Sequence, residues 1–265
     1  MSSTVTKALS LLEFFSEDEP ELGLSDIARR SGIDKAAVHR MLGAMAETGL
    51  VEQQPDTRHY RLGAGVLRLA RVREKAFPIQ AIVQPVLVAL SQRTGETAHA
   101  SLVSGNAMSN IGTCESKHGS RVSLVAGEVV PFHSTASGLS VLAFGGEKLV
   151  KRVLTNKRLA KTKFTLTGVP ELEAKIAEVQ GLGYCESNHT NEEGVHGLAA
   201  PVFDRAGLAC GAVSVSTPSH RVTPQARQQK IPAVIAAARA VTEGTGGQLP
   251  QHYVDCVRSY EEREG

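Results

Sequence analysis

The fold of the N-terminal part is decided by residues 24–42, LSDIARRSGIDKAAVHRML. Ser25 is a good N-cap and Gly32 suits the left-handed position that ends a helix, so the first half predicts a short helix. Asp34 is a good N-cap for a second helix. Its apolar residues recur at helical spacing and predict one buried stripe: Val38, Met41, Leu42 and Met45. Two helices joined by a tight turn are the pattern of a helix-turn-helix.

The segments on either side extend this pattern. Upstream, an apolar face is predicted on a helix that ends near the acidic residues 17–19, formed by Val5, Leu9, Leu12 and Phe15. Downstream, residues 50–53 and 59–62 alternate like strands around the turn 54–58, which predicts a β-hairpin. A hairpin directly after a helix-turn-helix is a wing, and Arg58 at its tip is placed to reach a phosphate or a minor groove.

The outer face of the second helix is expected to carry Lys35, Ala36, His39, Arg40 and Gly43. Small residues allow close approach to base edges, and basic residues reach phosphates or guanine. From spacing alone, a three-helix bundle with a solvated charged face fits equally well. The hairpin favours the DNA-binding alternative.

Composition limits the kind of partner. The 265 residues carry a formal charge of +2, but residues 58–75 hold six basic side chains against one acid, and residues 17–21 hold four acids. The near-neutral net charge of the chain therefore conceals a basic segment of the kind that binds nucleic acid. Aromatic residues make up 4% of the chain and there is no Trp, which argues against a stacking surface for single strands.

Localisation and metal binding follow from what the sequence lacks. The four cysteines contain no CxxC pair, and the chain shows neither a signal peptide nor a long apolar run. We expect reduced thiols, no metal, no cofactor and a cytoplasmic protein that does not enter a membrane.

The rest of the chain predicts a basic linker helix over residues 62–75 and then an α+β domain with a largely antiparallel sheet. The apolar residues of the linker exceed what one domain needs, so we expect it to dimerise. Strands are expected at 97–103, 108–114, 122–126, 129–132, 181–186, 197–203 and 208–216. Helices are expected over 81–92, from Ser134 to Ala143, from Pro170 and from Pro224. The segment 242–265 predicts a loosely attached tail.

Enzyme signatures are sparse. The chain contains no GxSxG, HExxH, GxxxxGK[ST] or GxGxxG motif. A hydrolase using His133 with Ser134 or Cys210 stays open as an alternative, as does a DNA-binding protein that takes no ligand. The segment around His133, Ser134, Thr135 and Ser137 better suits a polar pocket at a helix start, where free amides favour an anion such as a carboxylate.

The order of these motifs resembles the IclR family of bacterial transcriptional regulators over roughly residues 4–240. The resemblance lies in residues 24–42, in Tyr60-Arg61-Leu62-Gly63, in Gly95-Glu96-Thr97-Ala98, in residues 131–138, and in residues 191–195 with 199–204. This chain has Ala36-Ala37 where the family often has Ser-Thr. Specificity is therefore expected to depend on Lys35, His39, Arg40 and the wing.

The resemblance implies an α+β chain with four parts: an all-helical winged helix-turn-helix domain (residues 1–63), a linker helix (64–77), a GAF-like effector-binding domain (78–243) and a C-terminal tail (244–265). It implies a homodimer or homotetramer, a palindromic operator in double-stranded DNA, and a small organic acid as effector, with aromatic carboxylates among the candidates. The residues expected to contact DNA are Ser25, Lys35, Ala36, Ala37, His39, Arg40, Arg58 and Tyr60. The residues expected to bind the effector are His99, Met108, Asn110, His133, Ser134, Thr135, Ala136, Ser137, Gly138, Glu193, Cys210 and Ser214.

Overall fold

A computed structural model describes residues 3–16, 18–124 and 129–261 of the chain. The chain forms two compact units, residues 1–78 and 79–265. Three expectations fall partly outside the described residues. They concern Glu17 in the acidic loop, residues 125–128 between the strands expected at 122–126 and 129–132, and the last four residues of the tail.

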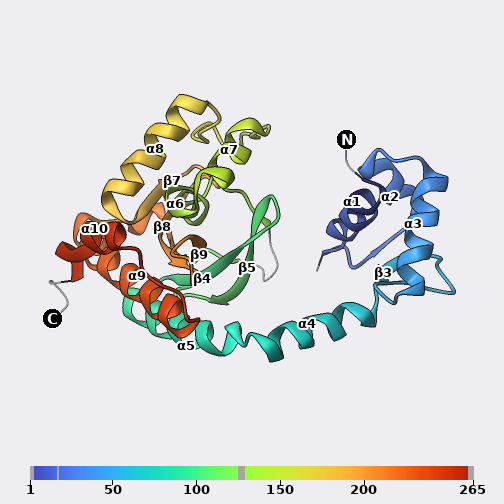
Figure 1. Cartoon of the computed structure of the whole chain (residues 1–265), viewed down its shortest axis with the longest axis horizontal. Coiled ribbons are helices and arrows are strands. Elements are labelled where there is room, and N and C mark those ends of the chain that lie inside the picture. Colours follow the sequence, from blue (N-terminus) through green and yellow to red (C-terminus); the bar gives the residue numbers. More distant parts are fainter. Residues whose placement is uncertain (1–2, 17, 125–128, 262–265) are drawn as a thin grey trace. The chain divides into compact units, whose positions relative to one another are not determined.

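The first unit is a small helical domain with a three-stranded antiparallel sheet in the order β1-β3-β2 (Figure 1). Its elements are α1 (Thr4–Ser10), the 3₁₀ turn η1 (Leu11–Phe14), β1 (Glu21–Leu22), α2 (Leu24–Ser31), α3 (Lys35–Glu47), β2 (Val51–Gln53), β3 (Tyr60–Leu62) and α4 (Ala64–Ala76). Strands β2 and β3 form the predicted wing. Strand β1 adds a third strand to this wing, and its two residues are too few to give a pattern in the sequence.

Local sequence explains the helix pair α2–α3. The Asp34 carboxylate accepts hydrogen bonds from the amides of Ala36 and Ala37, which caps α3 as predicted. Gly32 adopts φ +65° at the end of α2. Ser25 is not the cap of α2, because that helix begins one residue earlier, after Gly23.

The apolar face predicted for the first helix is correct only in its second half, where Leu12 and Phe15 are partly buried against the core. Val5 and Leu9 are exposed, and Leu11 is fully buried instead. The reason is that the α-helix ends at Ser10 and a 3₁₀ turn follows, so a single 3.6-residue period does not run through residues 5–15. The buried core of this unit consists of Leu11, Leu22, Ile27, Val38, Leu42, Met45, Val51 and Tyr60.

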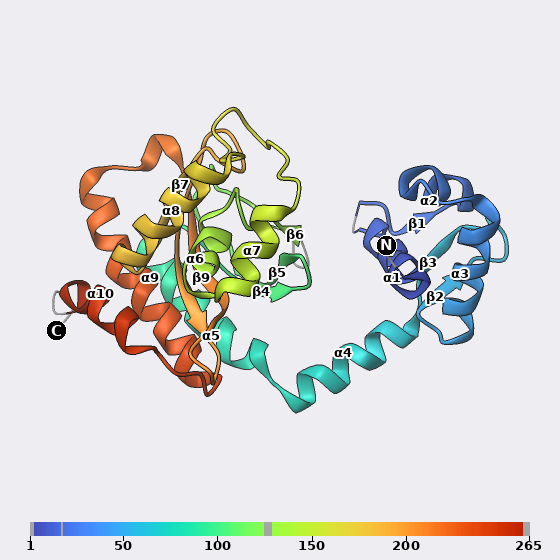
Figure 2. The same cartoon turned by 45° about the horizontal axis from the view of Figure 1, so that its top comes forward.

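The second unit is built on a six-stranded antiparallel sheet in the order β6-β5-β4-β9-β8-β7. Its strands are β4 (Thr97–Ser104), β5 (Ala107–Cys114), β6 (Val129–Val130), β7 (Cys185–Asn188), β8 (Val195–Phe203) and β9 (Ala209–Pro218). Its helical elements are α5 (Ile79–Thr94), α6 (Ala136–Phe144), α7 (Glu147–Thr155), α8 (Val169–Leu182), η2 (Ser219–Arg221), α9 (Pro224–Gly244) and α10 (Gln251–Glu261). The sheet separates α5 and α9 from α6, α7 and α8 (Figure 2).

Three expectations for this unit are corrected. Residues 122–124 form no strand, and β6 pairs with β5 instead of with them. Residues 181 and 182 end helix α8, so β7 begins later than predicted, at Cys185. Helix α7 was not predicted.

The C-terminal segment is not a loose tail. Helix α10 contacts α8 and α9, and its Tyr253 and Val257 are almost completely buried. The Tyr253 ring makes edge contacts with Phe144 and Phe203 in the core. The glycine-rich residues 244–247 end α9 and form the turn that follows it. Glycines at such a turn are the reason that the sequence predicted a loosely attached tail. Over the described residues, no helix is long and apolar enough to cross a membrane.

Candidate functional site

The first unit has a groove between its helix pair and its wing. The groove has a volume of about 400 Å³ and is lined by Gly23, Leu24, Ser25, Asp26, His39, Gln53, Thr57, Arg58, His59 and Tyr60. Four of the residues expected to contact DNA therefore meet there: Ser25, His39, Arg58 and Tyr60. Tyr60 is almost completely buried, however, so it belongs to the core and leaves only its edge to the groove.

The other predicted contacts lie on α3. Lys35, Ala36 and Arg40 are exposed. Ala37 is half-buried and lines a different groove together with Val5 and Ala8 of α1. Arg40 also lines this second groove, and the exposed residues of α3 include Lys35, Ala36, His39, Arg40 and Gly43.

Ion pairs divide the basic residues of this unit into two groups. Arg29 pairs with Asp26 at 2.8 Å, Arg30 with Glu19 at 2.6 Å, and Arg61 with Glu52 at 3.2 Å. The hydrogen bond from Arg30 lowers the pKa of Glu19 below its usual value. Among the described residues, Lys35, Arg40 and Arg58 have no acidic partner, and these are the basic residues of the α3 face and the wing tip. Their charge is available to phosphates.

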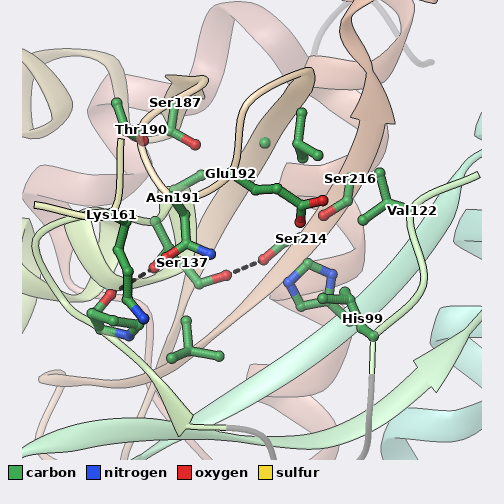
Figure 3. Close-up of a pocket in the computed structure, with 17 residues that line it drawn as sticks. His99, Val122, Ser137, Lys161, Ser187, Thr190, Asn191, Glu192, Ser214 and Ser216 are labelled. Atoms are coloured by element: carbon green, nitrogen blue, oxygen red, sulfur yellow. Dashed lines mark hydrogen bonds between the residues drawn. The ribbon is translucent and has the colours of Figure 1, made fainter. Parts of the chain in front are cut away.

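The second unit contains a polar cavity of about 90 Å³ between the sheet and the start of α6, and the cavity opens to solvent where the exposed residues Lys161, Asn191 and Glu192 line it (Figure 3). Strand register explains which side chains face it. His99 of β4 lies opposite Ser214 of β9, and Ser216 stands two residues further along the same strand. Because side chains alternate across a sheet, these three share the face that α6 covers. Ser137 of α6 closes the contact through a hydrogen bond between its hydroxyl and that of Ser214.

The walls of the cavity are tied together by a chain of hydrogen bonds. The Ser134 hydroxyl donates to Oδ1 of Asn191 at 2.9 Å, and the Thr190 hydroxyl donates to the Ser134 carbonyl at 2.6 Å. The Thr165 hydroxyl donates to the Thr190 carbonyl at 2.6 Å. Nε2 of His133 lies 2.9 Å from the Leu159 carbonyl. These bonds join residues 133–135, 159–165 and 189–191 into one frame around the cavity.

The structure brings five of the twelve predicted effector residues to the cavity: His99, Thr135, Ala136, Ser137 and Ser214. Seven do not line it: Met108, Asn110, His133, Ser134, Gly138, Glu193 and Cys210. His133 and Ser134 instead make the hydrogen bonds to Leu159 and Asn191 that join the walls of the cavity. Gly138 lets α6 pack on the backbone of Phe132, because a Cβ on Gly138 would lie 2.4 Å from the Phe132 Cα.

Sequence reasoning missed several lining residues. They are Val122, Leu124, Val130, Pro131, Lys161, Ser187, Thr190, Asn191, Glu192, Val195, Gly197 and Ser216. Glu192 lines the cavity in the place expected for Glu193, and both side chains are exposed. Lys161 comes from a segment without regular structure, and no sequence pattern links such a segment to the cavity.

The groups considered for a hydrolase, together with His99, can be judged from their surroundings. Burial lowers the pKa of His99 to about 4, so this imidazole is neutral near pH 7. Its Nδ1 has no hydrogen-bond partner among the described residues. Burial raises the pKa of the Cys210 thiol to about 11, which leaves it protonated. The hydroxyl of Ser134 donates to an amide oxygen, and His133 bonds to a backbone carbonyl, so this pair lacks the alignment of a nucleophile and its base.

Comparisons with known proteins cover both units. Residues 4–55 match the model of the IclR helix-turn-helix domain, and residues 74–243 match that of the bacterial transcriptional regulator IclR C-terminal domain. The chain is 29% identical over 247 residues to the transcriptional repressor IclR of Escherichia coli, covering 92% of this chain and 90% of that protein.

Solved structures agree with these matches. A crystal structure from Silicibacter sp. TM1040, assigned to the IclR transcriptional regulators, is 40% identical and superposes with a TM-score of 0.88 over 94% of this chain and 99% of the other. An IclR homologue from Microbacterium hydrocarbonoxydans, complexed with 4-hydroxybenzoate, shares the fold at 23% identity and a TM-score of 0.73, covering 92% of this chain and 99% of the other.

Proposed function

Because the chain belongs to the IclR family of ligand-responsive, DNA-binding bacterial transcriptional regulators, we propose that it represses a catabolic operon. In this proposal α3 and the wing bind a palindromic operator, and a small organic acid in the cavity of the second unit releases the protein from DNA. As a member of this family it is a regulator and not an enzyme.

The observation that carries the proposal is the set of basic side chains without acidic partners on the α3 face and the wing tip. Recognition helices contact base edges with their N-terminal half, where Lys35, His39 and Arg40 lie. Arg58 at the wing tip is suited to a phosphate or to an adjacent minor groove. Repression is inferred from the Escherichia coli relative, which is a transcriptional repressor.

A homodimer or homotetramer is supported by helix α4. None of its residues is buried, and Leu67, Leu69 and Val72 are exposed together with the neighbouring Phe77. Apolar side chains of this size on one short helix favour a second copy as the covering surface. A symmetric pair of α3 helices then reads two half-sites of a palindrome, and effector binding changes the distance between half-sites through α4.

Operator binding tests the DNA-contact assignment. An operator is first selected from random duplex DNA, and its Kd is then measured across salt concentrations for the wild type, Arg40→Ala and Arg58→Ala. Each substitution is expected to weaken binding, and loss of a phosphate contact reduces the slope of log K against log salt by about 1. Arg258→Ala, in α10, is the control and is expected to bind like the wild type. Unchanged affinity in both test variants contradicts the assignment.

A further inference from the structure

The cavity of the second unit is small and has no aromatic side chain in its lining. Its volume of about 90 Å³ corresponds to roughly three water molecules, whereas a cavity that holds a benzene ring measures about 150 Å³. No Phe, Tyr or Trp is among the described lining residues, so a ring would find no stacking partner. Both observations favour a compact aliphatic ligand.

The lining is rich in hydroxyl groups. Thr135, Ser137, Ser187, Thr190, Ser214 and Ser216 all contribute to it, and the amide of Asn191 stands beside them. Four of these hydroxyls are already hydrogen-bonded within the protein: Ser137 and Ser214 bond to each other, Thr135 donates to the Pro131 carbonyl, and Thr190 donates to the Ser134 carbonyl. Ser187 and Ser216 make no side-chain hydrogen bond within the described residues, so these hydroxyls can bond to oxygen atoms of a ligand. The ligand is therefore expected to carry several oxygens on few carbons.

Charge is distributed asymmetrically in the cavity. Figure 3 shows Lys161 on the side of Ser137 and Asn191, and the Glu192 carboxylate on the other side, towards Ser216 and His99. Lys161 is the one lysine or arginine among the described lining residues. On its side, the backbone amides of Ala136 and Ser137 begin helix α6 and donate no hydrogen bond within the described part of the chain. An ammonium and two free amides at a helix N-terminus form an anion site.

The opposite side suits an uncharged group. His99 is 8% exposed, its ring stands beside Ser214, and its Nδ1 is unpartnered within the described chain. A buried polar atom without a partner is costly unless a ligand satisfies it. Glu192 on this side repels a second carboxylate and accepts a hydrogen bond from a hydroxyl. His99 and Glu192 together therefore fit an alcohol.

We propose that the effector is a compact aliphatic hydroxy acid, whose carboxylate binds Lys161 and the first turn of α6 and whose hydroxyl binds His99 and Glu192. This inference rests on the proposed ligand response and narrows it: it names the ligand class and assigns Lys161 and His99 as its specificity-determining residues.

Titration calorimetry on the full chain with matched probes tests the inference. Lactate and glycerate carry both groups, propionate lacks the hydroxyl, 1,2-propanediol lacks the carboxylate, and benzoate carries a ring. At least one hydroxy acid is expected to bind about tenfold more tightly than propionate, since one hydrogen-bonding group is worth about that factor. Benzoate is expected to bind more weakly than that hydroxy acid.

Two substitutions test the binding of the carboxylate and of the hydroxyl separately. Lys161→Gln is expected to weaken the hydroxy acid and propionate by the same factor, at least about tenfold for a charge-assisted contact. Lys163→Gln, two residues away and outside the lining, is the control. His99→Leu is expected to weaken the hydroxy acid and leave propionate unchanged. The ratio of the hydroxy-acid affinity to the propionate affinity does not change if a fraction of the variant protein is unfolded. His99→Gln is measured as a second variant at the same position.

Tighter binding of benzoate, no binding of either hydroxy acid, or unchanged lactate and glycerate affinity in Lys161→Gln overturns the inference. The proposed function is judged separately on the same protein by operator binding. If benzoate binds and releases the operator, regulation by an acid stands and the hydroxy-acid assignment fails. If the hydroxy acid binds and operator affinity is unaffected, the ligand class stands and the regulatory proposal fails.

Discussion

The carboxylate of Glu52 in the wing accepts a hydrogen bond from the backbone amide of Ala64, the first residue of α4, at 3.1 Å. The same carboxylate pairs with Arg61, and these two contacts lower the pKa of Glu52. One residue further, the amide of Gly65 donates to the carbonyl of Gly49 at 2.8 Å. Helix α4 is thereby fastened to the wing and to the turn that follows α3.

We predict that Gly65→Ala loosens this junction. A Cβ at Gly65 would lie 2.6 Å from the Gly49 carbonyl oxygen, which forces the backbones apart. Overpacking of this kind costs about 1–3 kcal/mol, measured as the free energy of unfolding in urea. Gly43→Ala is the matched control, because no atom lies within 4 Å of the added methyl and a helical glycine gains from the change. Equal stability of the two variants would show that the junction is not close-packed.

The buried charges at the start of β4 predict a large effect at Glu96. Glu96 pairs with Arg221 at 2.6 Å and with Lys230 at 3.2 Å, and it is almost completely buried. Replacing it by Ala leaves two cations without their shared partner, which costs about 3–5 kcal/mol of unfolding free energy. Glu178→Ala removes a surface pair with Lys175 and is expected to cost less than about 1 kcal/mol. A loss at Glu96 as small as at Glu178 contradicts the structural role.

The low pKa of His99 predicts a pH dependence of stability. Its pKa is about 4 in the folded chain and 6.5 when exposed, so the unfolded state binds the proton more tightly. The contribution of His99 is present above pH 6.5 and is lost as the pH falls towards 4. Between pH 7 and pH 5 the wild type should lose about 2 kcal/mol more than His99→Leu in chemical denaturation. Parallel losses in both proteins would mean that His99 titrates normally.

Helix α10 is predicted to be part of the core of the second unit. Tyr253→Ala removes an almost completely buried ring that packs on Phe144 and Phe203, which costs about 3–5 kcal/mol. His252→Ala, at an exposed neighbouring position, is the control for the loss of a ring; the His252 ring stacks on Phe144 from the surface, so its loss is expected to cost less than that of Tyr253. The stability of both variants is measured by thermal unfolding. A Tyr253 variant that melts with the wild type contradicts the packing of α10.

Local signals explain why the helix-turn-helix and its wing were predictable. Asp34 and Gly32 act within their own turns, and residues 50–62 are contiguous, so short-range chemistry determines these elements. The predicted cap at Ser25 was wrong because Gly23, two residues earlier, occupies the N-cap position of α2. The face of the first helix was only partly correct because the chain changes from an α-helix to a 3₁₀ turn at Leu11.

The cavity was less predictable because its walls come from distant segments. Ser137 and Ser214 meet across 77 residues, and Lys161 belongs to a segment held by hydroxyl-to-carbonyl bonds of Thr162 and Thr165. The polarity of residues 133–137 was visible in the sequence. Which of them would face the cavity and which would hold its frame depended on the direction of each side chain, and for His133 and Ser134 that direction is set by Leu159 and Asn191.

Effector binding in the cavity and operator binding are expected to be coupled. The operator Kd of the wild type is determined with and without a saturating concentration of the acid that binds the cavity, alongside Lys161→Gln at the same acid concentration. We predict that the acid weakens operator binding at least about tenfold in the wild type, corresponding to about 1.4 kcal/mol of coupling, and much less in the variant. An operator Kd that the bound acid leaves unchanged in the wild type would contradict the account.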